Sequence, residues 1–306
     1  MTKHINKLSN PFSTGGGGIN FETRVQACFV TLMLSGGFAP CLPQWPIKKI
    51  KLQGKYVGYD TDDAIIFVES PDRKKESKLL CQVKHSISIT KTNKVFGEVI
   101  RSAWNDFNNK NLFTACTDLI ALITGPLSAT DMNDVRTILE WSRNSENAED
   151  FLTKVNQTNF SSKQKRGKLI VFRTHLKNAN DGVDVTDEKF WQFMKSFHLL
   201  EYDLDIKSGV ILSLLQSLIG QFSPENASSL WAQIINEVQS TNQNAGTITV
   251  NSISKEIVSV FQKRIVETIP TDLGIKPSAP KVSDWNNIKF ANELAIAILL
   301  GGWDES

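Results

Sequence analysis

Three short apolar runs between residues 47 and 84 constrain the fold of this chain more than any other feature. Ile47 to Leu52 alternates apolar residues with lysine, Ala64 to Val68 is continuously apolar, and Leu79 to Lys84 follows the charged turn PDRKKESK. β-Branched and apolar runs of this length, separated by turn residues, are typical of strands. We therefore predict three neighbouring strands, of which the last two can pair as an antiparallel hairpin.

Helical and further strand patterns surround these runs. Apolar residues repeat at helical spacing from Phe21 to Leu32, and Gly36-Gly37 ends that helix. The glycine run Gly15 to Gly18 before it predicts a flexible loop, since glycine holds regular structure at a cost. Further along, the pattern predicts helices at 95–108 and 131–144 and strands at 119–124 and 168–172. Together these elements indicate an α/β fold with a mixed sheet flanked by helices.

The character of the sequence changes after about Asp184, where helical patterns dominate. They cover 187–197, 209–222, 227–239 and 250–267, and a segment with three prolines, Pro270 to Pro280, follows. An amphipathic pattern from Trp285 to Leu300 ends the chain. We predict four regions: a core at 1–180, an α-helical extension at 181–268, a linker at 269–284 and a terminal helix at 285–306.

Composition excludes several classes of protein. The 306 residues include 34 basic and 32 acidic side chains, so net charge says nothing for or against a nucleic-acid partner. Four cysteines lie at spacings unlike those of zinc sites, and those at 28 and 81 fall in apolar runs that favour buried free thiols. The polar N-terminus lacks the pattern of a secretory signal, and no apolar run is long enough to span a membrane. We expect a cytoplasmic location.

A group of polar residues at the strand ends predicts chemistry. Gln82 and Lys84 are two apart, so they project from one side of their strand, and antiparallel pairing brings Asp63 near them. Glu22 in the preceding helix is the fourth member. Carboxylate and amide oxygens are ligands for Mg²⁺, and a lysine beside the cation can lower the pKa of a bound water or neutralise phosphate charge. We predict a catalytic and metal site in which Asp63, Glu22, Gln82 and the adjacent Asp62 are the candidate ligands.

This D…Q-x-K arrangement resembles the PD-(D/E)xK nuclease superfamily, and within it the Mrr-like branch. Asp63 precedes the strand AIIFV, Gln82-Val83-Lys84 forms Q-x-K, and Glu22 in INFETRVQA matches the helix glutamate of many such nucleases. No proline precedes the aspartate, which leaves Asp62 and Asp63 both open as the ligand. The resemblance implies a restriction-endonuclease-like sheet and a Mg²⁺-dependent reaction, with Mn²⁺ as a possible substitute.

A longer resemblance covers nearly the whole chain. The runs NPFSTGGGGINFETRVQA, LSGGFAPCLP, KLQGKYVGYDTDD, QVKHSISIT and LITGPLSATD are similar to the N-terminal nuclease region of antiviral STAND NTPases of the type-4 class. This implies an endonuclease that cleaves double-stranded DNA in bacterial anti-phage defence and that forms a homo-oligomer in the full-length protein. No P-loop motif occurs here, so we expect ATP and the phage protein to be bound by parts beyond this sequence.

Basic residues suggest where a DNA partner would bind. They gather in three clusters, which are Lys48, Lys49, Lys51 and Lys55; Lys91 and Lys94; and Lys163, Lys165 and Arg166. We favour Lys91, Lys94 and Arg101, just beyond the third strand, together with Lys55, as DNA-binding residues. The alternative is that each cluster is a solvated face.

Other interpretations remain open at this point. The acidic turn could be a solvated cap, and Glu22 could serve only the helix dipole. The sheet could then be the scaffold of a catalytically silent interaction and oligomerisation module, or the enzyme could be an RNase. His85 is interpreted as structural, and Trp104, Trp141, Trp191 and Trp231 as core residues. The sequence leaves open the cleavage preference, the number of metal ions and the activity of this region alone.

Overall fold

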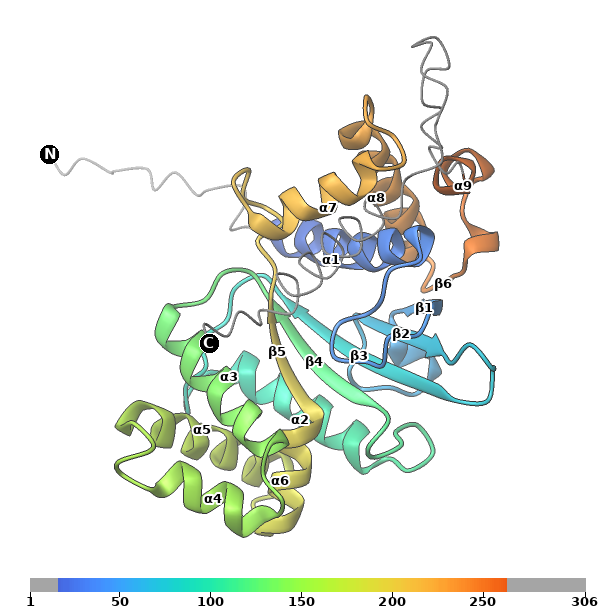
Figure 1. Ribbon diagram of the computed structural model, residues 1–306. Coiled ribbons are helices and arrows are strands. Elements are labelled where there is room, and N and C mark those ends of the chain that lie inside the picture. Colours follow the sequence, from blue (N-terminus) through green and yellow to red (C-terminus); the bar gives the residue numbers. More distant parts are fainter. Residues whose placement is uncertain (1–15, 263–306) are drawn as a thin grey trace, which may run out of the picture. The chain divides into compact units, whose positions relative to one another are not determined.

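A six-stranded mixed sheet forms the centre of the molecule in the computed structural model, which describes residues 16–262 (Figure 1). Its strand order is β5-β4-β3-β2-β1-β6. Neighbours from β6 to β3 are antiparallel, whereas β3, β4 and β5 are parallel. The strands are β1 (Ile47–Leu52), β2 (Ala64–Glu69), β3 (Glu76–Lys84), β4 (Leu119–Thr124), β5 (Phe197–Glu201) and β6 (Thr247–Ile248).

Helices cover both faces of the sheet, as Figure 1 shows. One face carries α1 (Gly16–Ser35), α7 (Val210–Gly220), α8 (Ala227–Gln243) and α9 (Lys255–Gln262); the other carries α2 (Lys94–Asn108), α3 (Ala129–Arg143), α4 (Ala148–Asn156), α5 (Lys163–Ala179) and α6 (Asp187–Ser196). Within residues 16–262, the connections include the 3-10 turns η2 (Gly54–Val57) and η3 (Val250–Ser252).

The two cores follow from the alternation of side chains along the strands. In β2, Ala64 and Ile66 join the core with α1, whereas Ile65 and Phe67 join the core with α2 to α6. A strand buried on both faces reads as a continuous apolar run, which explains the unbroken sequence AIIFV. The predicted α/β class, with a mixed sheet between helices, is confirmed.

Two local predictions are wrong. The segment 168–172 is not a strand but lies within α5. The Ser162 side chain caps that helix by accepting from the Lys165 amide, and buried Leu169, Phe172 and Leu176 recur at helical spacing. The glycines at 16–18 do not form a loop but the first turn of α1, because burial of the rest of this 20-residue helix offsets their cost.

The predicted helical extension takes part in the same sheet. The helices expected at 187–197, 209–222 and 227–239 are present as α6, α7 and α8, but the region also contributes β5 and β6. These strands pair with β4 and β1. The linker at 269–284 and the terminal helix at 285–306 lie outside the described residues.

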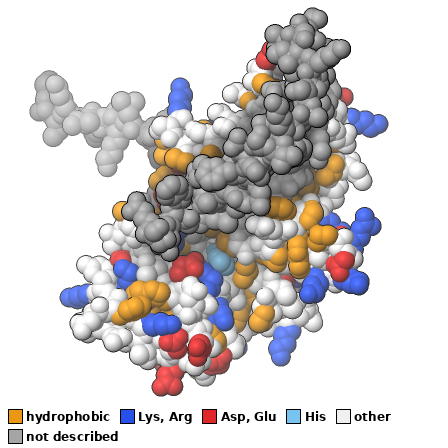
Figure 2. All heavy atoms as spheres, viewed as in Figure 1, with side chains coloured by type: hydrophobic (Ala, Val, Ile, Leu, Met, Phe, Trp, Pro, Cys, Tyr) orange, Lys and Arg blue, Asp and Glu red, His pale blue; other side chains and the backbone are white. Residues whose placement is uncertain are grey.

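Surface and thiol features agree with a folded domain of balanced charge. On the face shown in Figure 2, acidic and basic side chains are interspersed. Cys28 and Cys81 are buried free thiols, as predicted, and Cys41 and Cys116 are exposed and unpaired.

The tryptophans predicted to lie in the core mostly do so. Trp104, Trp191 and Trp231 are core residues, whereas Trp141 is only partly buried. In the part of the chain that the structure describes, every helix is too short or too polar to span a bilayer.

Candidate functional site

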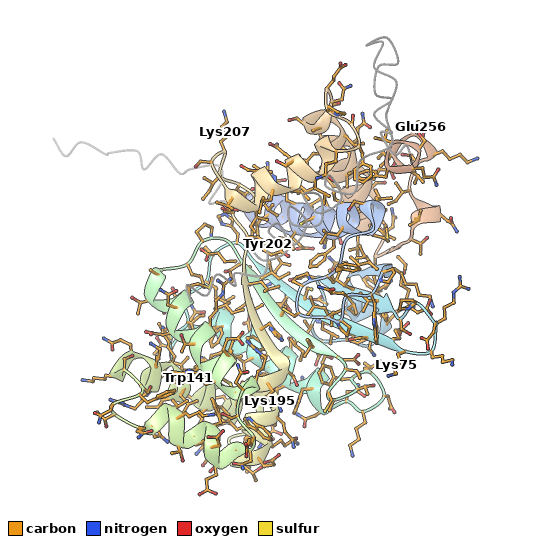
Figure 3. All side chains as sticks on the ribbon, in the orientation of Figure 1. Lys75, Trp141, Lys195, Tyr202, Lys207 and Glu256 are labelled. Atoms are coloured by element: carbon orange, nitrogen blue, oxygen red, sulfur yellow. The ribbon has the colours of Figure 1, made fainter. Side chains whose placement is uncertain are left out.

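The register of the β2–β3 hairpin brings the predicted residues together. Ala64 pairs with Cys81, so Asp63, one residue earlier, lies level with Gln82. The Gln82 amide Nε2 and the Val83 backbone N–H both donate to Asp63 Oδ2, each at 2.5 Å. Lys84 Nζ lies 3.7 Å from the same oxygen. The predicted meeting of Asp63, Gln82 and Lys84 is confirmed, at the end of the hairpin opposite the turn that carries Lys75 (Figure 3).

Two other segments hold the acidic turn that presents Asp63. The buried Asp106 carboxylate on α2 accepts hydrogen bonds from the Asp60 and Thr61 backbone N–H groups at 2.9 and 2.7 Å. Gly54 N–H donates to the Asp62 carbonyl at 2.7 Å. The turn is therefore fixed from α2 and from η2, and it places Asp63 against Gln82 and Lys84.

Helix α1 supplies Glu22 and the amide that links it to the turn. Gln26, one turn after Glu22, donates from Nε2 to Glu22 Oε1 at 2.9 Å and to the Asp63 carbonyl at 2.8 Å. Gln53 Nε2 and Asn242 Nδ2 donate to the same Glu22 oxygen at 3.3 and 3.2 Å. Three amides thus hold Glu22 beside Asp63, and one of them comes from α8.

Burial is the main cause that raises the pKa of both carboxyl groups. The pKa of Glu22 rises to about 7, chiefly through burial and then through the Asp63 charge, while hydrogen bonds from Asn242 and Gln26 oppose the rise. The pKa of Asp63 is raised by burial, which outweighs the lowering effects of Lys84 and the Val83 N–H. Perturbed acids with a specific charge partner are typical of functional sites. Two carboxylates sharing one ammonium favour an additional cation.

The donor set fits one hydrated cation better than a closed metal cage. Among the described residues, no three His, Cys, Asp or Glu side chains are placed to hold a metal ion together. Mg²⁺ commonly uses only one or two protein carboxylates and keeps its waters. Glu22 and Asp63 supply that number. The Gln26 Oε1 atom is buried without a hydrogen-bond partner, and its own amide nitrogen bridges Glu22 and the Asp63 carbonyl. An unsatisfied buried oxygen, in an amide that contacts the Glu22 carboxylate, fits a nearby cation or water.

The basic residues predicted to bind DNA do not all share one place. Lys91, Lys94 and Arg101 line one cavity of about 320 Å³ at the start of α2. Lys55 lies on η2 and does not line that cavity. His85 packs edge-on against Phe21, with ring centroids 5.2 Å apart, and its Nε2 lies 3.4 Å from the Asp205 carboxylate.

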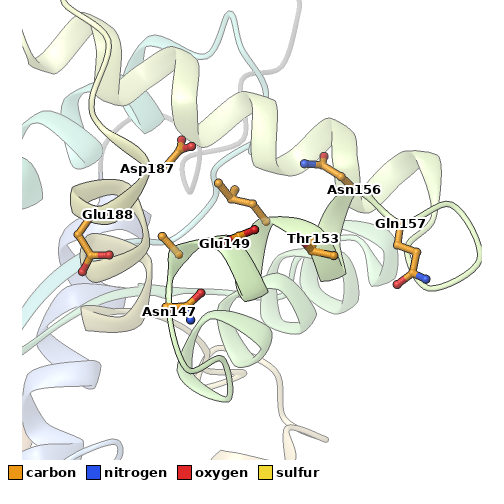
Figure 4. A pocket seen from close by; sticks show the side chains of 9 residues that line it. Asn147, Glu149, Thr153, Asn156, Gln157, Asp187 and Glu188 are labelled. Carbon is orange, nitrogen blue, oxygen red and sulfur yellow. The ribbon is translucent and has the colours of Figure 1, made fainter.

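A larger cavity lies elsewhere and shares none of these residues. It measures about 960 Å³ and lies between α4 and the start of α6 (Figure 4). Asn147, Glu149, Asp187 and Glu188 line it. Two of these side chains already have structural partners, since Asn147 caps α4 and Asp187 pairs with Arg173 at 2.6 Å. Acidic residues at helix starts are favourable by themselves, so this cavity is no candidate site.

Sequence reasoning missed the residues that position the site. Asp106, Gln53 and Asn242 carry no motif, and Asn242 lies 220 residues from Glu22. Only Gln26 had a signal, because it follows Glu22 by four residues and so shares its helix face.

Comparisons with known proteins give a weak likeness and no family. No family model and no curated protein matches the sequence. Solved structures of the Acinetobacter baumannii Cap4 SAVED/CARF-domain containing receptor are similar in fold. The complex with the cyclic trinucleotide 2′3′3′-cAAA is 12% identical, with a TM-score of 0.45, over 79% of this chain and 47% of that one. The complex with 3′3′3′-cAAA is 11% identical, with a TM-score of 0.44, over 79% of this chain and 49% of that one.

The chain therefore spans about half the length of these receptors. At such identity and TM-score, the likeness carries no argument about what this chain binds. It does correct the predicted family. The chains found are described as SAVED/CARF-domain receptors, not as nucleases of antiviral STAND NTPases, and no family model places this chain in the Mrr-like branch.

The predicted membership, and the function as an endonuclease of double-stranded DNA that it implied, are corrected accordingly and not carried further. The physical reason lies in the motif. Any antiparallel hairpin with this register places Asp63 beside Gln82, so D…Q-x-K describes a local geometry and does not identify a family.

Proposed function

We propose that Glu22, Asp63, Gln82 and Lys84 form a divalent-cation site, for Mg²⁺ or Mn²⁺, that hydrolyses a phosphodiester bond. The observation that carries the proposal is the placement of two carboxyl groups with raised pKa beside one lysine and one unpartnered amide oxygen. The proposed substrate is a phosphodiester in general, and not the DNA duplex of the corrected assignment.

Each residue has a distinct part in this chemistry. Asp63 and Glu22 would hold the cation, and when bound it would polarise the phosphate and activate water. Gln82 donates its amide N–H to Asp63 and so fixes which carboxylate oxygen stays available. Lys84, with a side chain one-third exposed and 3.7 Å from Asp63, can turn toward a phosphate and balance the charge that develops during the reaction.

The test uses the whole chain with a simple substrate. Bis(4-nitrophenyl) phosphate and a short labelled single-stranded oligonucleotide are incubated with Mn²⁺ or Mg²⁺, and Mn²⁺ binding is followed by electron paramagnetic resonance. We expect cation-dependent hydrolysis by the wild type and its loss in Asp63→Asn. Lys207→Ala, which changes an exposed lysine outside the site (Figure 3), is the control and should keep full activity.

The outcomes separate two functions. Mn²⁺ binding that depends on Asp63, without hydrolysis of either substrate, would overturn the enzymatic part and favour a silent, cation-stabilised interaction module. No Mn²⁺ binding at all would overturn the site itself. Hydrolysis that Asp63→Asn leaves intact would assign the chemistry to other residues.

A further inference from the structure

A second, cationic site is built at the start of α2, away from the carboxylates. A cavity of about 320 Å³ is lined there by Lys91, Lys94 and Arg101 on one side and by His175 on α5. One acidic side chain, Glu98, also lines it, so three cations face one carboxylate. No ion pair joins Glu98, or any other described acid, to these three cations.

The floor of this cavity is formed by a histidine that contacts both the loop before α2 and α2 itself. His175 is buried, and its Nε2 lies 2.8 Å from the Thr90 carbonyl, which ties α5 to the loop before α2. Its ring packs edge-on against Phe96. Gly97 permits this approach, because a Cβ atom there would lie 3.0 Å from His175 Nδ1. A floor held by these contacts lowers the entropic cost of binding, because chiefly the basic side chains must be ordered.

Several cations of the other basic clusters already have partners. Lys48 pairs with Glu69 at 2.5 Å, and Lys49 lies over the Phe67 ring at 4.2 Å. Lys51 donates to the Ala245 carbonyl at 2.5 Å, and Lys165 pairs with Asp134 at 3.1 Å. Cations that already have partners contribute little to the binding of a ligand. The three cations of the cavity have no such ion pair and can direct their charge to a bound anion.

We infer that the Lys91, Lys94 and Arg101 cavity binds a phosphate group. Arg101 can offer two parallel donors to phosphate oxygens, and the two lysines add point charges. The Asn93 side chain caps α2 and already engages the Phe96 N–H, so the recognition rests on the three cations and not on the helix terminus. The same group could come from a free polyphosphate or from a nucleotide strand. This inference does not depend on hydrolysis at Asp63.

The test measures binding of two probes by calorimetry. Sodium tripolyphosphate and a short oligothymidylate are titrated into the wild type and into the triple variant K91A/K94A/R101A. The matched control K48A/K49A/K165A loses the same net charge from cations that already have partners. We expect the cavity variant to weaken binding of at least one probe by about tenfold or more and the control to change it little.

Each outcome decides the matter. Loss with tripolyphosphate alone assigns a free polyphosphate, and loss with the oligothymidylate, alone or together with tripolyphosphate, assigns the phosphates of a strand; each of these results supports the inference. No binding by the wild type, or equal loss in the two variants, would overturn it. Asp63→Asn is titrated in parallel: retained binding there, alongside failed hydrolysis, keeps the fate of this cavity separate from that of the carboxylate site.

Discussion

Strand β3 carries a lysine–aspartate pair at each end, and the two pairs differ. Near its start, Lys78 Nζ lies 3.1 Å from Asp118 Oδ2, with side-chain exposures of 15% and 2%. Asp118 also accepts from the Lys78 and Thr114 backbone N–H groups, and Lys78 donates to the Leu112 carbonyl. At its end, Lys84 and Asp63 are 3.7 Å apart, with exposures of 33% and 10%.

The pair at Asp118 is structural, whereas the pair at Asp63 can accept a further cation. At Asp118, short contacts and backbone donors satisfy both partners, as a buried ion pair requires. At Asp63, the ammonium stands farther off, a second acid lies close by, and the pKa of the carboxyl is raised by burial. A lysine of β3 paired with an aspartate therefore stabilises the fold at one end of the strand. At the other end, the same kind of pair leaves room for a cation.

The largest expected contrast is between Asp118→Asn and Asp63→Asn. Asp118→Asn breaks a satisfied buried pair and should lower the free energy of unfolding by about 3 kcal/mol. Asp63→Asn should leave that free energy unchanged or raise it, because burial disfavours the charged form of Asp63. Urea unfolding measures both variants. Equal destabilisation by the two would erase the distinction between the pairs.

Replacing the lysines sharpens the comparison. Lys84→Met removes an ammonium that competes with the cation, so Mn²⁺ binding should hold or tighten while hydrolysis falls by about a hundredfold. Lys78→Met should instead lower the free energy of unfolding. The rate of hydrolysis per folded molecule should stay unchanged in this variant. Electron paramagnetic resonance and phosphodiester hydrolysis give the two readouts. Weaker Mn²⁺ binding in Lys84→Met would show that its role is to hold Asp63 in place.

The raised pKa of Glu22 predicts that the stability of the fold depends on pH. Its folded pKa of about 7 lies above the ordinary value of 4.5, so the folded state keeps a proton that the unfolded state loses in that window. The free energy of unfolding should therefore fall as pH rises from about 4.5 to about 7, and Glu22→Gln should flatten this decline. Mn²⁺ affinity should rise over the same window, because the cation competes with the proton. An unchanged pH profile in Glu22→Gln would contradict the assignment.

The sequence predicted the architecture where local patterns decide it. The predictions match the structure for most helices and for the strands at 47–52, 64–68, 79–84 and 119–124. Burial on one or two faces gives each of these segments a recognisable pattern of apolar residues. The failure at 168–172 has a physical cause as well. KLIVF is apolar enough for a strand, and only its place between the Ser162 cap and Leu176 makes it helical.

The residues of the motif could be predicted from the sequence, but the residues that hold them in place could not. Asp63, Gln82 and Lys84 meet because strand period and register are local properties of the sequence. Asp106, Gln53 and Asn242 reach the site through tertiary packing, and nothing near them in the sequence marks that contact. The family inferred from short matching runs failed for a related reason, since such runs constrain turns and strands but not the identity of the whole fold.

The smallest expected effect concerns α8, which reaches Glu22 through a single amide. Asn242 Nδ2 donates to Glu22 Oε1, and Asn242 Oδ1 accepts from Gln53 at 3.0 Å, so its removal leaves both polar neighbours less satisfied. Asn242→Ala should raise the pKa of Glu22 further, because this hydrogen bond opposes the rise caused by burial. The pH at which Mn²⁺ affinity levels off should then move upward, with affinity at neutral pH falling a few-fold.

The matched control for this prediction is Asn244→Ala, two residues away. The Asn244 side chain donates only to the Ser240 carbonyl at the surface. Loss of its hydrogen bond therefore changes the end of α8 without touching Glu22. A shift in Asn242→Ala alone would place the helical layer in direct control of the carboxylate pair. A shift of equal size in both variants would instead mean that Glu22 senses the stability of α8 as a whole, and the specific role of Asn242 would be lost.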